Sequence, residues 1–402
     1  MPKTLSIKLA TGTLHLDLLP GRIPLKRLLG FAARISSKRK FLLVSKILGK
    51  HYPVSPNIMR WSYRALARAV LKNAPGSNSL WIGMAETATG LGYGVFEAAS
   101  HEGLTSALFM QTTRYHLAGI EKLEFTEAHS HATDFFLYYP VCAAYREQFL
   151  SAKTLVLIDD EISTGKTFLC LIKAYQAINL NLSQVCIVSL VNFAQAEDRL
   201  ALETQTGVAV AWIYLRTGQL RFEDNENAAL ANRVVNVSSN GACKKALLAW
   251  PGRLGIAAPI HLDKEVVTAV SALFRTADDN RPLLVLGTGE CNALSFMLGR
   301  ALQQAGFKVK VQSTTRSPIH QGNDIASVCE FKDNYQDDIP NFIYNLNPAD
   351  YREIIICHET PLCPVIIERL HAWQAISAQL EGIDYPPSES PEPYAKLHFF
   401  RP

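Results

Sequence analysis

The sequence predicts an α/β fold with two successive domains, and three observations support this. From Leu80 onward, short apolar runs alternate with amphipathic helical patterns, an order that implies a parallel sheet flanked by helices. Loops rich in small residues follow several of these runs, at the position where a parallel strand leads into a helix. The chain has 402 residues, 48% hydrophobic and 19% charged, which suits well-packed domains and excludes a disordered protein.

A hairpin and a helix precede this series. Apolar residues alternate with polar ones over residues 5–9 and 14–18 around Thr11-Gly12, a hairpin pattern. A strand at Phe41–Val44 and an amphipathic helix at Ile58–Leu71 follow. The alternating series then predicts strands at Leu80–Met84, Ala107–Met110, Phe135–Tyr139, Leu155–Ile158, Val185–Val191 and Val208–Tyr214.

A second α/β series follows a junction within Asn225–Pro259. It predicts strands at Leu283–Leu286 and Val309–Gln312, with a helix from Asn292 to Gln304 between them. Tyr385–Pro393 is rich in proline and serine and predicts an extended tail segment. We therefore expect a first domain over residues 1–240 and a second, Rossmann-like α/β domain over residues 260–402.

Charge is distributed unevenly along the chain. The first 85 residues hold 15 Lys and Arg against a single acid, Asp17, whereas the rest of the chain has 25 against 35. Such a basic segment could bind nucleic acid, surround a ligand with several phosphates, or dock on the acidic remainder. The cluster around Lys38-Arg39-Lys40 lacks the interleaved aromatic residues of a single-strand binder, so we favour the polyphosphate ligand.

Other features of the composition point to a cytoplasmic protein. No run approaches the roughly 18 uninterrupted apolar residues of a membrane span, and the N-terminus lacks a signal-peptide pattern. The eight cysteines are scattered and contain no Cys-x-x-Cys pair, which favours buried thiols in a reducing compartment over disulfides or zinc. We therefore expect no membrane partner.

Residues 154–167 form the most informative segment. The apolar run Leu155–Ile158 predicts a buried parallel strand, and Asp159 and Asp160 follow at its carboxyl end. The loop 163–167 (Ser-Thr-Gly-Lys-Thr) then leads into a helical pattern. Backbone N–H groups at a helix N-terminus suit a phosphate, and adjacent carboxylates suit vicinal hydroxyls. The pattern therefore indicates a sugar-phosphate site.

Two other interpretations compete with this one. The sequence Gly165-Lys166-Thr167 suggests a Walker A loop, but Asp160 stands where that motif requires glycine, and an acid there would repel the phosphates. An ordinary strand-to-loop junction is the second alternative, because short motifs give false positives.

The segment resembles the loop that binds 5-phosphoribosyl 1-diphosphate (PRPP) in type I phosphoribosyltransferases. In that family the two acids hold the ribose 2′- and 3′-hydroxyls, and the small-residue loop holds the 5′-phosphate. The resemblance implies that PRPP is bound by Asp159, Asp160, Glu161, Ser163, Thr164, Gly165, Lys166 and Thr167.

A second loop lies about 75 residues earlier, where this family has its pyrophosphate loop. Residues Glu86, Thr87, Ala88 and Thr89 open a helix and would offer N–H groups to pyrophosphate. We expect Lys46 and Lys50 of the basic segment to fold over this site and contact the polyphosphate. Arg114 and the histidines His129 and His131 lie where the family has its mobile flap; they would contact departing pyrophosphate or be surface loop residues.

Two histidines without further ligands are a poor metal site, so the sequence assigns no residue as a metal ligand. Arg114 is counted with Asp159 and Asp160 among the candidate catalytic residues.

The second domain has a motif of its own. The loop Gly287-Thr288-Gly289-Glu290 follows a predicted strand, but one Gly-x-Gly is weak support for a dinucleotide site. The next strand ends in Thr314-Thr315-Arg316-Ser317-Pro318. Over residues 30 to 400 the chain resembles a two-part bacterial family, in which an orotate-transferase-like domain precedes a "TRSP" domain and whose genes often lie near tellurium-resistance genes. We predict a second anion site formed by Gly287, Thr288, Gly289, Glu290, Thr315, Arg316 and Ser317.

The second domain could also be a diverged copy of the first. Thr112-Thr113-Arg114 and Thr314-Thr315-Arg316 lie 202 residues apart, and an offset near 198 places Asp159 and Asp160 over Cys357 and His358. The alternative is that all α/β units share the order strand, loop and helix for physical reasons. The sequence supports duplication and this alternative about equally.

These patterns predict a phosphoribosyltransferase-like enzyme in nucleotide or nucleoside-like metabolite synthesis. It would use PRPP and Mg²⁺ to form or phosphorolyse an N-ribosidic bond, with an unidentified base or nucleotide as the other substrate. A homodimer is compatible with the sequence. The alternative is a regulator without turnover that senses PRPP or binds nucleic acid, the latter being the less favoured partner.

Overall fold

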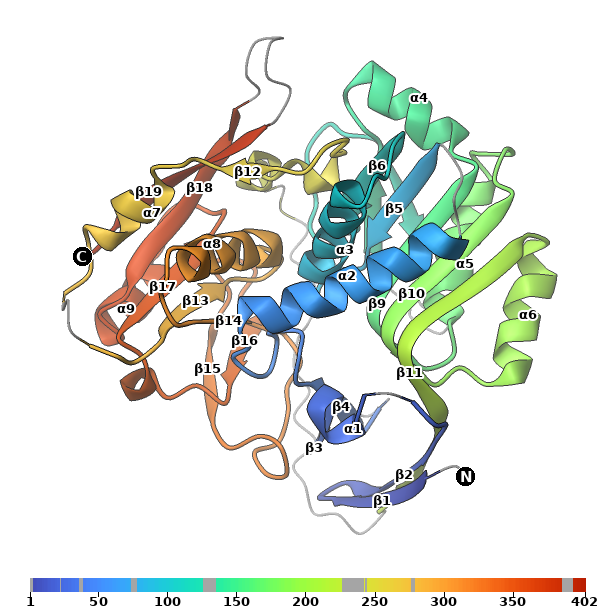
Figure 1. The fold of residues 1–402 in the computed structure, drawn as a ribbon, viewed down its shortest axis with the longest axis horizontal. Helices are drawn as coiled ribbons and strands as arrows, with labels where there is room; N and C mark the ends of the chain where they lie inside the picture. The colour runs from blue at the N-terminus through green and yellow to red at the C-terminus, as the bar shows by residue number, and fades with distance from the viewer. Residues whose placement is uncertain are drawn as a thin grey trace.

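The computed structural model describes residues 3–21, 23–35, 39–73, 78–125, 135–225, 242, 244–275, 279–384 and 393–402. It has two main sheets, each flanked by helices, which confirms the predicted α/β class (Figure 1). The first sheet lies on the right of Figure 1 and the second on the left, with the helix α2 (Pro56–Asn73) running across both.

The first sheet has the order β1-β2-β11-β10-β9-β5-β6. The strand β11 is long, so its first half pairs parallel with β10 and its second half antiparallel with β2. Strands β1 and β2 form the predicted hairpin, and the other strands of the sheet are parallel. The bounds are β1 Lys3–Leu9, β2 Gly12–Leu18, β5 Ser79–Gly83, β6 Ala107–Gln111, β9 Thr154–Ile162, β10 Gln184–Asn192 and β11 Ala209–Asp224.

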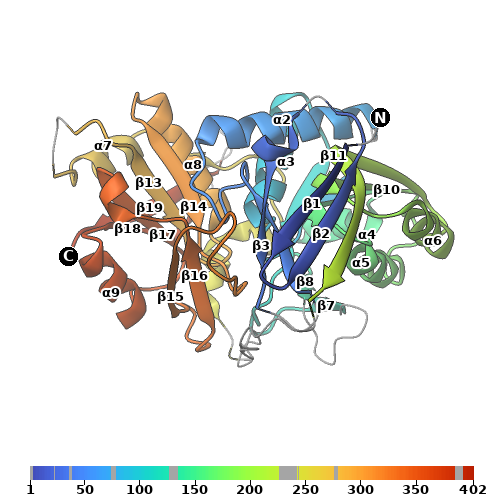
Figure 2. The ribbon, with the colours of Figure 1, turned by 90° about the horizontal axis from the view of Figure 1, so that it is seen from below.

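Helices cover both faces of this sheet (Figures 1 and 2). On one face lie α2 and α3 (Thr89–His101), and on the other α4 (Ala143–Ser151) and α5 (Lys166–Gln176), with α6 (Ala196–Thr206) beside α5. The predicted amphipathic pattern explains α2: its buried residues recur every three or four positions and face the core. They include Met59, Tyr63, Leu66, Ala67 and Val70.

The second sheet has the order β12-β19-β18-β17-β13-β14. Strands β14, β13, β17 and β18 are parallel, and β19 is antiparallel to β18. The bounds are β12 His261–Leu262, β13 Leu283–Gly287, β14 Val309–Ser313, β17 Glu353–His358, β18 Ile376–Asp384 and β19 Tyr394–Phe400, with helices α7 Val266–Ser271, α8 Asn292–Gln304 and α9 Pro364–Ala372.

Smaller elements lie outside the two main sheets. They are the helix α1 Leu25–Leu28, the two-stranded pairs β3 Leu29–Ala33 with β4 Phe41–Ser45, β7 Lys122–Phe125 with β8 Phe135–Tyr138, and β15 Val328–Lys332 with β16 Pro340–Tyr344, and the 3-10 helices η1 Lys245–Ala249, η2 Pro251–Arg253 and η3 Pro348–Asp350.

One predicted strand differs from the structure. The strand at Phe135–Tyr139 exists as β8, but it pairs antiparallel with β7 in a separate two-stranded sheet instead of joining the parallel sheet. The strand β19, which follows the predicted tail segment in sequence, pairs with β18. Residues 385–392 themselves lie outside the described residues. The sequence could not show this pairing because it depends on a strand partner beyond the segment.

The two halves of the molecule repeat one arrangement. The order β6-β5-β9-β10-β11 in the first sheet matches β14-β13-β17-β18-β19 in the second, although β19 runs the other way. After β6 a bridge joins Thr113 to Phe136, and after β14 a bridge joins Thr315 to Phe342. The two halves share a strand order, a hairpin and a bridge after the corresponding strand, which is more than the alternation of strands and helices common to α/β proteins. This similarity favours an origin of the second half by duplication of the first.

The strand register corrects the predicted offset by one residue. In the first half Gly83 pairs with Ile158, and in the second half Gly287 pairs with Cys357. The residue after each partner is Asp159 and His358, respectively. The acids Asp159 and Asp160 are therefore matched by His358 and Glu359 instead of Cys357 and His358.

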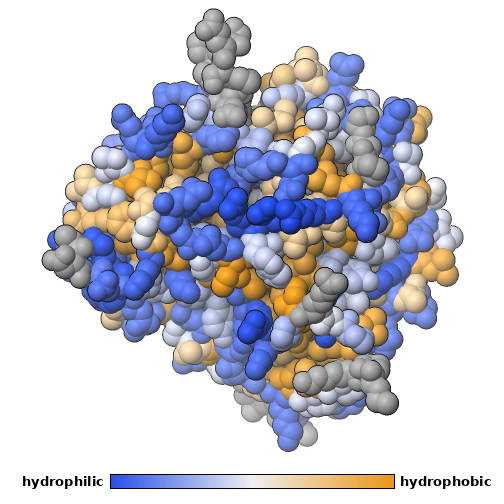
Figure 3. Space-filling model, viewed as in Figure 1, coloured by the Kyte–Doolittle hydropathy of each residue, from blue (hydrophilic) through white to orange (hydrophobic). Residues whose placement is uncertain are grey.

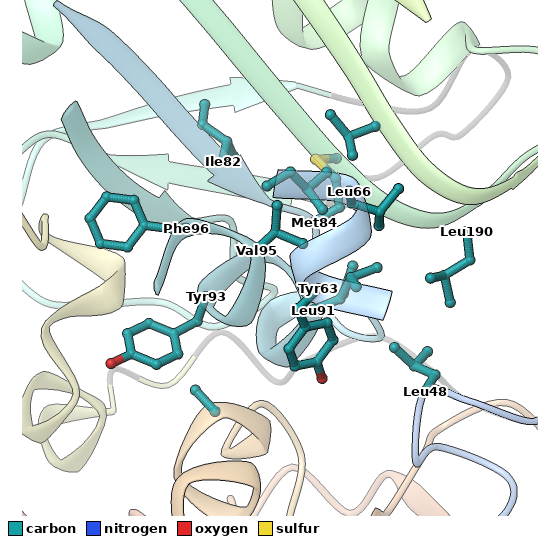
Figure 4. Close-up of a cluster of buried hydrophobic side chains, with 14 of the residues drawn as sticks. Leu48, Tyr63, Leu66, Ile82, Met84, Leu91, Tyr93, Val95, Phe96 and Leu190 are labelled. Atoms are coloured by element: carbon teal, nitrogen blue, oxygen red, sulfur yellow. The ribbon is translucent and has the colours of Figure 1, made fainter. Parts of the chain in front are cut away.

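The halves exchange segments across their interface. Val54, just before α2, forms a bridge with Val311 of β14, and Ile256 forms the corresponding bridge with Phe109 of β6. Helices α3 and α8 pack closely, and glycine at position 90 permits this approach, since a Cβ atom there would lie only 2.9 Å from Cβ of Asn292. Around them lies a cluster of buried apolar side chains that includes Tyr63, Leu91 and Tyr93 (Figure 4). Tyr63 also contacts Phe296 of α8 edge-on. One continuous core thus joins both halves.

Candidate functional site

The carboxyl end of β9 presents three consecutive acids. Leu155–Ile158 are buried between the helical layers, as predicted, whereas Asp159, Asp160 and Glu161 are partly exposed. β9 lies between β5 and β10, so the acids stand at the edge where the loops of three parallel strands meet. The backbone N–H of Asp160 donates to Oδ1 of Asp159 (2.9 Å), which fixes that carboxylate against the strand end.

The acids perturb one another. Burial raises the pKa of Asp160 to about 7, with the charge of Glu161 adding to the effect. Burial, and then the neighbouring Asp160, also raise the pKa of Asp159 well above its ordinary value. Glu161 forms an ion pair with Arg39, and Lys50 opposes the shift at Asp160. A site with several perturbed carboxyls is typical of a functional centre.

The loop after β9 has the geometry of a phosphate site. Gly165 has a left-handed backbone (φ 81°) and caps α5, the predicted helix, which begins at Lys166, two residues before the predicted helical pattern. A Cβ atom there would lie at ordinary contact distance, 3.4 Å from Leu202 and Trp212, so glycine is favoured by the left-handed conformation. Ser163 and Lys166 are exposed, and the N–H groups of the first helical turn point out of the helix.

The second predicted loop adjoins the first. Met84 donates its N–H to the carbonyl of Ile158 (2.9 Å), which ties the end of β5 to the end of β9. Ala85 donates its N–H to Oγ1 of Thr112 (2.8 Å), and the Ala85–Glu86 peptide bond is cis. Thr87 is partly exposed, whereas Glu86, Ala88 and Thr89 are buried. The two predicted loops therefore lie side by side.

The two lysines predicted to reach this site have different positions. Lys50 is buried and forms an ion pair with Glu86 (2.8 Å) in the second loop. Lys46 instead pairs with Asp324 (2.7 Å) of the second half and lies over the ring of Tyr52. Direct contact of either lysine with pyrophosphate stays a prediction.

Arg114 lies at the border between the halves. Its guanidinium carbon lies 4.2 Å from the centroid of the Phe135 ring. Its backbone N–H donates to Oε1 of Glu290 (3.1 Å). A catalytic role for Arg114 stays a prediction. His129 and His131 lie outside the described residues.

The residues of the predicted second-domain anion site lie near one another, but several of them already bond to other residues of the protein. Thr288, Glu290, Thr315 and Arg316 are buried, and Gly289 donates its N–H to Oγ1 of Thr314. Arg316 forms an ion pair with Glu86 of the first half (Nε to Oε2, 3.3 Å). Anion binding at this loop stays a prediction.

The sequence analysis missed Arg253. This side chain is completely buried and bridges Glu290 (2.8 Å) and Glu359 (2.7 Å). Burial opposes its charge, but the two carboxylates prevail and hold the pKa of Arg253 well above its ordinary value. Arg253 falls in the predicted junction, of which residues 226–241 and 243 lie outside the described residues, and no local motif marks its role.

Two family models match successive parts of the chain. A phosphoribosyl transferase model matches residues 28–219, and a model of the TRSP domain C-terminal to that transferase domain matches residues 250–371. The two matched regions thus correspond to a phosphoribosyl transferase domain followed by a TRSP domain.

Solved structures of adenine phosphoribosyltransferases are similar to part of the chain. The enzyme of Saccharomyces cerevisiae is 14% identical over 46% of this chain and 94% of its own, with a TM-score of 0.33. The Trypanosoma brucei enzyme is 14% identical over 58% and 98% (TM-score 0.35), and the Giardia lamblia enzyme 18% over 47% and 94% (TM-score 0.31). Likeness of this size does not identify a substrate. No curated protein matches the chain.

Among the described residues, no helix combines the length and apolar character needed to cross a membrane. The cytoplasmic location, the homodimer, the orotate-like type and the link to tellurium resistance stay predictions.

Proposed function

We propose that the first domain is an enzyme acting on PRPP with Mg²⁺, which forms or phosphorolyses an N-ribosidic bond. The observation that carries this proposal is the acid pair Asp159-Asp160 beside a glycine-capped helix start, at the end of one parallel strand. A sugar phosphate needs both features at once, and the loop after β5, whose helix start offers backbone N–H groups, lies beside them.

Each element has a role in this proposal. Asp159 and Asp160 accept hydrogen bonds from the ribose hydroxyls, and the N–H groups of residues 163–167 hold the 5′-phosphate. The loop Glu86–Thr89 holds the diphosphate. A nitrogen nucleophile forms a bond to C1′ while the bond from C1′ to the diphosphate oxygen breaks, and the electron pair leaves with diphosphate. Catalysis comes from positioning and charge stabilisation.

The donor set suits Mg²⁺, which prefers oxygen ligands and is commonly held by one or two carboxylates together with substrate phosphates. Asp159 and Asp160 would hold it here. The raised pKa values of these carboxyls favour their protonated forms, and a bound cation would oppose this and favour the ionised forms. When bound, Mg²⁺ stabilises the charge of the leaving diphosphate.

A metabolite screen for PRPP-dependent pyrophosphate release tests the proposal. We expect release with one class of nitrogen base, and at least a ~100-fold loss in the double variant Asp159→Asn/Asp160→Asn, because two charge-assisted bonds are removed. Glu147→Gln on the exposed surface of α4 is the matched control and should retain activity. PRPP binding by calorimetry that is unchanged in the double variant would contradict the assignment.

One surface favours the alternative of a regulator that binds nucleic acid without turnover. The outer face of α2 forms a shallow hollow of about 280 Å³ lined by Arg60, Trp61, Arg64 and Arg68, with Asn57 and Ala65. Figure 3 shows a hydrophilic band over this helix. Stacked aromatic and guanidinium groups suit a nucleic-acid strand, although Glu102 already pairs with Arg64 and Arg68.

Titration of RNA and DNA across salt concentrations distinguishes the alternatives. A regulator would bind with a steep salt dependence, which Arg60→Gln with Trp61→Ala would weaken, and would release no pyrophosphate.

A further inference from the structure

Glu86 lies between two cations that come from different halves of the molecule. Lys50, from the segment before α2, contacts Oε1 (2.8 Å), and Arg316, from the Thr314–Pro318 motif of the second half, contacts Oε2 (3.3 Å). The three residues are 1% (Lys50), 7% (Arg316) and 8% (Glu86) exposed. A residue of the TRSP domain therefore stands directly at the proposed pyrophosphate loop.

The ion pairs at this loop place two positive charges around one negative charge. Both cations are buried, and a buried charge is costly unless it is paired. The charge of Lys50 also opposes the rise in the pKa of Asp160 that burial causes, so this charge acts on the acid pair as well. An anion that approaches this loop would therefore be attracted to it.

The corresponding loop of the second half has the opposite pattern. Ala85 and Gly289 donate equivalent hydrogen bonds to Thr112 and Thr314, which makes Glu86 and Glu290 equivalent. Around Glu290 the carboxylate contacts Arg253, a cation shared between two carboxylates, and accepts hydrogen bonds from the hydroxyl of Thr113 and the backbone N–H of Arg114. This loop would repel an anion, whereas the first would attract one.

Arg316 is also held in a defined orientation. Its guanidinium lies over the ring of Tyr115 (4.7 Å), and Tyr115 stacks on Tyr335 of the second half (4.3 Å between centroids). A planar guanidinium fixed on an aromatic face and largely removed from water binds phosphate oxygens strongly and in a defined geometry.

We propose that Arg316 is a positioning residue of the first site: with Lys50 it neutralises Glu86 and orients the loop that receives the diphosphate group of the substrate. The site is thus a composite of both halves, and the TRSP motif serves the transferase domain instead of a separate pocket. This inference rests on the proposed function.

Calorimetry of the full chain with Mg-pyrophosphate and, separately, with ribose 5-phosphate tests the inference. For Arg316→Gln we expect about 10- to 100-fold weaker pyrophosphate binding and ribose 5-phosphate binding within about two-fold of the wild type, because only the first ligand reaches the Glu86 loop. Arg316→Lys should recover part of the loss. Arg281→Gln, which removes an exposed ion pair in the same half, is the matched control.

The outcomes separate the two proposals. If the wild type binds neither ligand, the proposed function fails. If the wild type binds both and Arg316→Gln binds pyrophosphate normally, the inference is wrong while the function stands. A purely structural role would lower both affinities together, in parallel with the unfolding temperature. If Arg316→Gln does not fold, the ratio of the two affinities in Arg316→Lys decides the question.

Discussion

Replacing Asp160 with asparagine should stabilise the protein at alkaline pH. Burial raises the pKa of this carboxyl from 3.8 to about 7, so the folded protein binds its proton more tightly than the unfolded chain does. Between these two values, stability falls as the pH rises, because ionisation is favoured in the unfolded chain. Above about pH 7 the loss is complete. The asparagine side chain carries no charge at any pH, so the variant avoids this loss.

The size of the effect follows from the same values. A change from 3.8 to about 7 corresponds to about 4 kcal/mol at 1.36 kcal/mol per pKa unit. Since Asp160 is partly exposed, solvent screening lowers this, and we expect about 1–2 kcal/mol, or roughly 1–3 °C in the unfolding temperature of a chain of this size.

Thermal unfolding of wild type and Asp160→Asn at about pH 5 and about pH 8.5 measures this effect. The advantage of the variant should grow between the two values, while ribose 5-phosphate binding weakens. Glu147→Gln should show no such change. The reasoning would be refuted if the variant gained the same unfolding temperature over the wild type at both pH values. It would also be refuted if the variant were less stable than the wild type at the higher pH.

Three further predictions concern stability. Arg253→Leu leaves two buried carboxylates without their shared cation and should cost about 3–5 kcal/mol by denaturant unfolding, whereas a loss below about 1 kcal/mol would show that the pair is not buried in solution. Gly165→Ala should cost about 1 kcal/mol because of its positive φ, with Gly103→Ala, also at positive φ but in open space, as a comparison; a neutral Gly165→Ala would contradict the left-handed cap. Tyr93→Phe removes a hydroxyl that donates to and accepts from the backbone of Ile260, and should lower stability by about 1–3 kcal/mol in the same measurement, an unchanged value being the contrary result.

The local features of the site could be predicted from the sequence. The strand over Leu155–Ile158, the acids after it and the following helix depend on neighbouring residues, and all three are present, the helix starting two residues before the predicted pattern. Helix α8 was likewise predicted with its bounds at Asn292 and Gln304. Such elements need only periodicity and end signals, which are local properties of the chain.

The partners of charged residues could not be predicted. Lys46 pairs with Asp324 and Arg316 with Glu86, each across more than 200 residues of sequence. Composition indicates that the basic N-terminal segment needs acidic partners, but only the packing of the two halves selects them. Comparing the two sequences also misplaced the acid pair by one residue against the second half, because similar apolar strands align in more than one register and only their pairing partners fix it.

The reciprocal bridges of Val54 with Val311 and of Ile256 with Phe109 affect how the molecule would respond to dilution. Two separate chains joined by the same contacts would dissociate when their concentration fell below the dissociation constant, and any site built from both would be lost. A covalent connection replaces that bimolecular equilibrium with an intramolecular one, whose effective concentration is set by chain length and is commonly millimolar. Contacts such as that between Arg316 and Glu86 therefore form at the same fraction in a cell that holds few copies as in one that holds many.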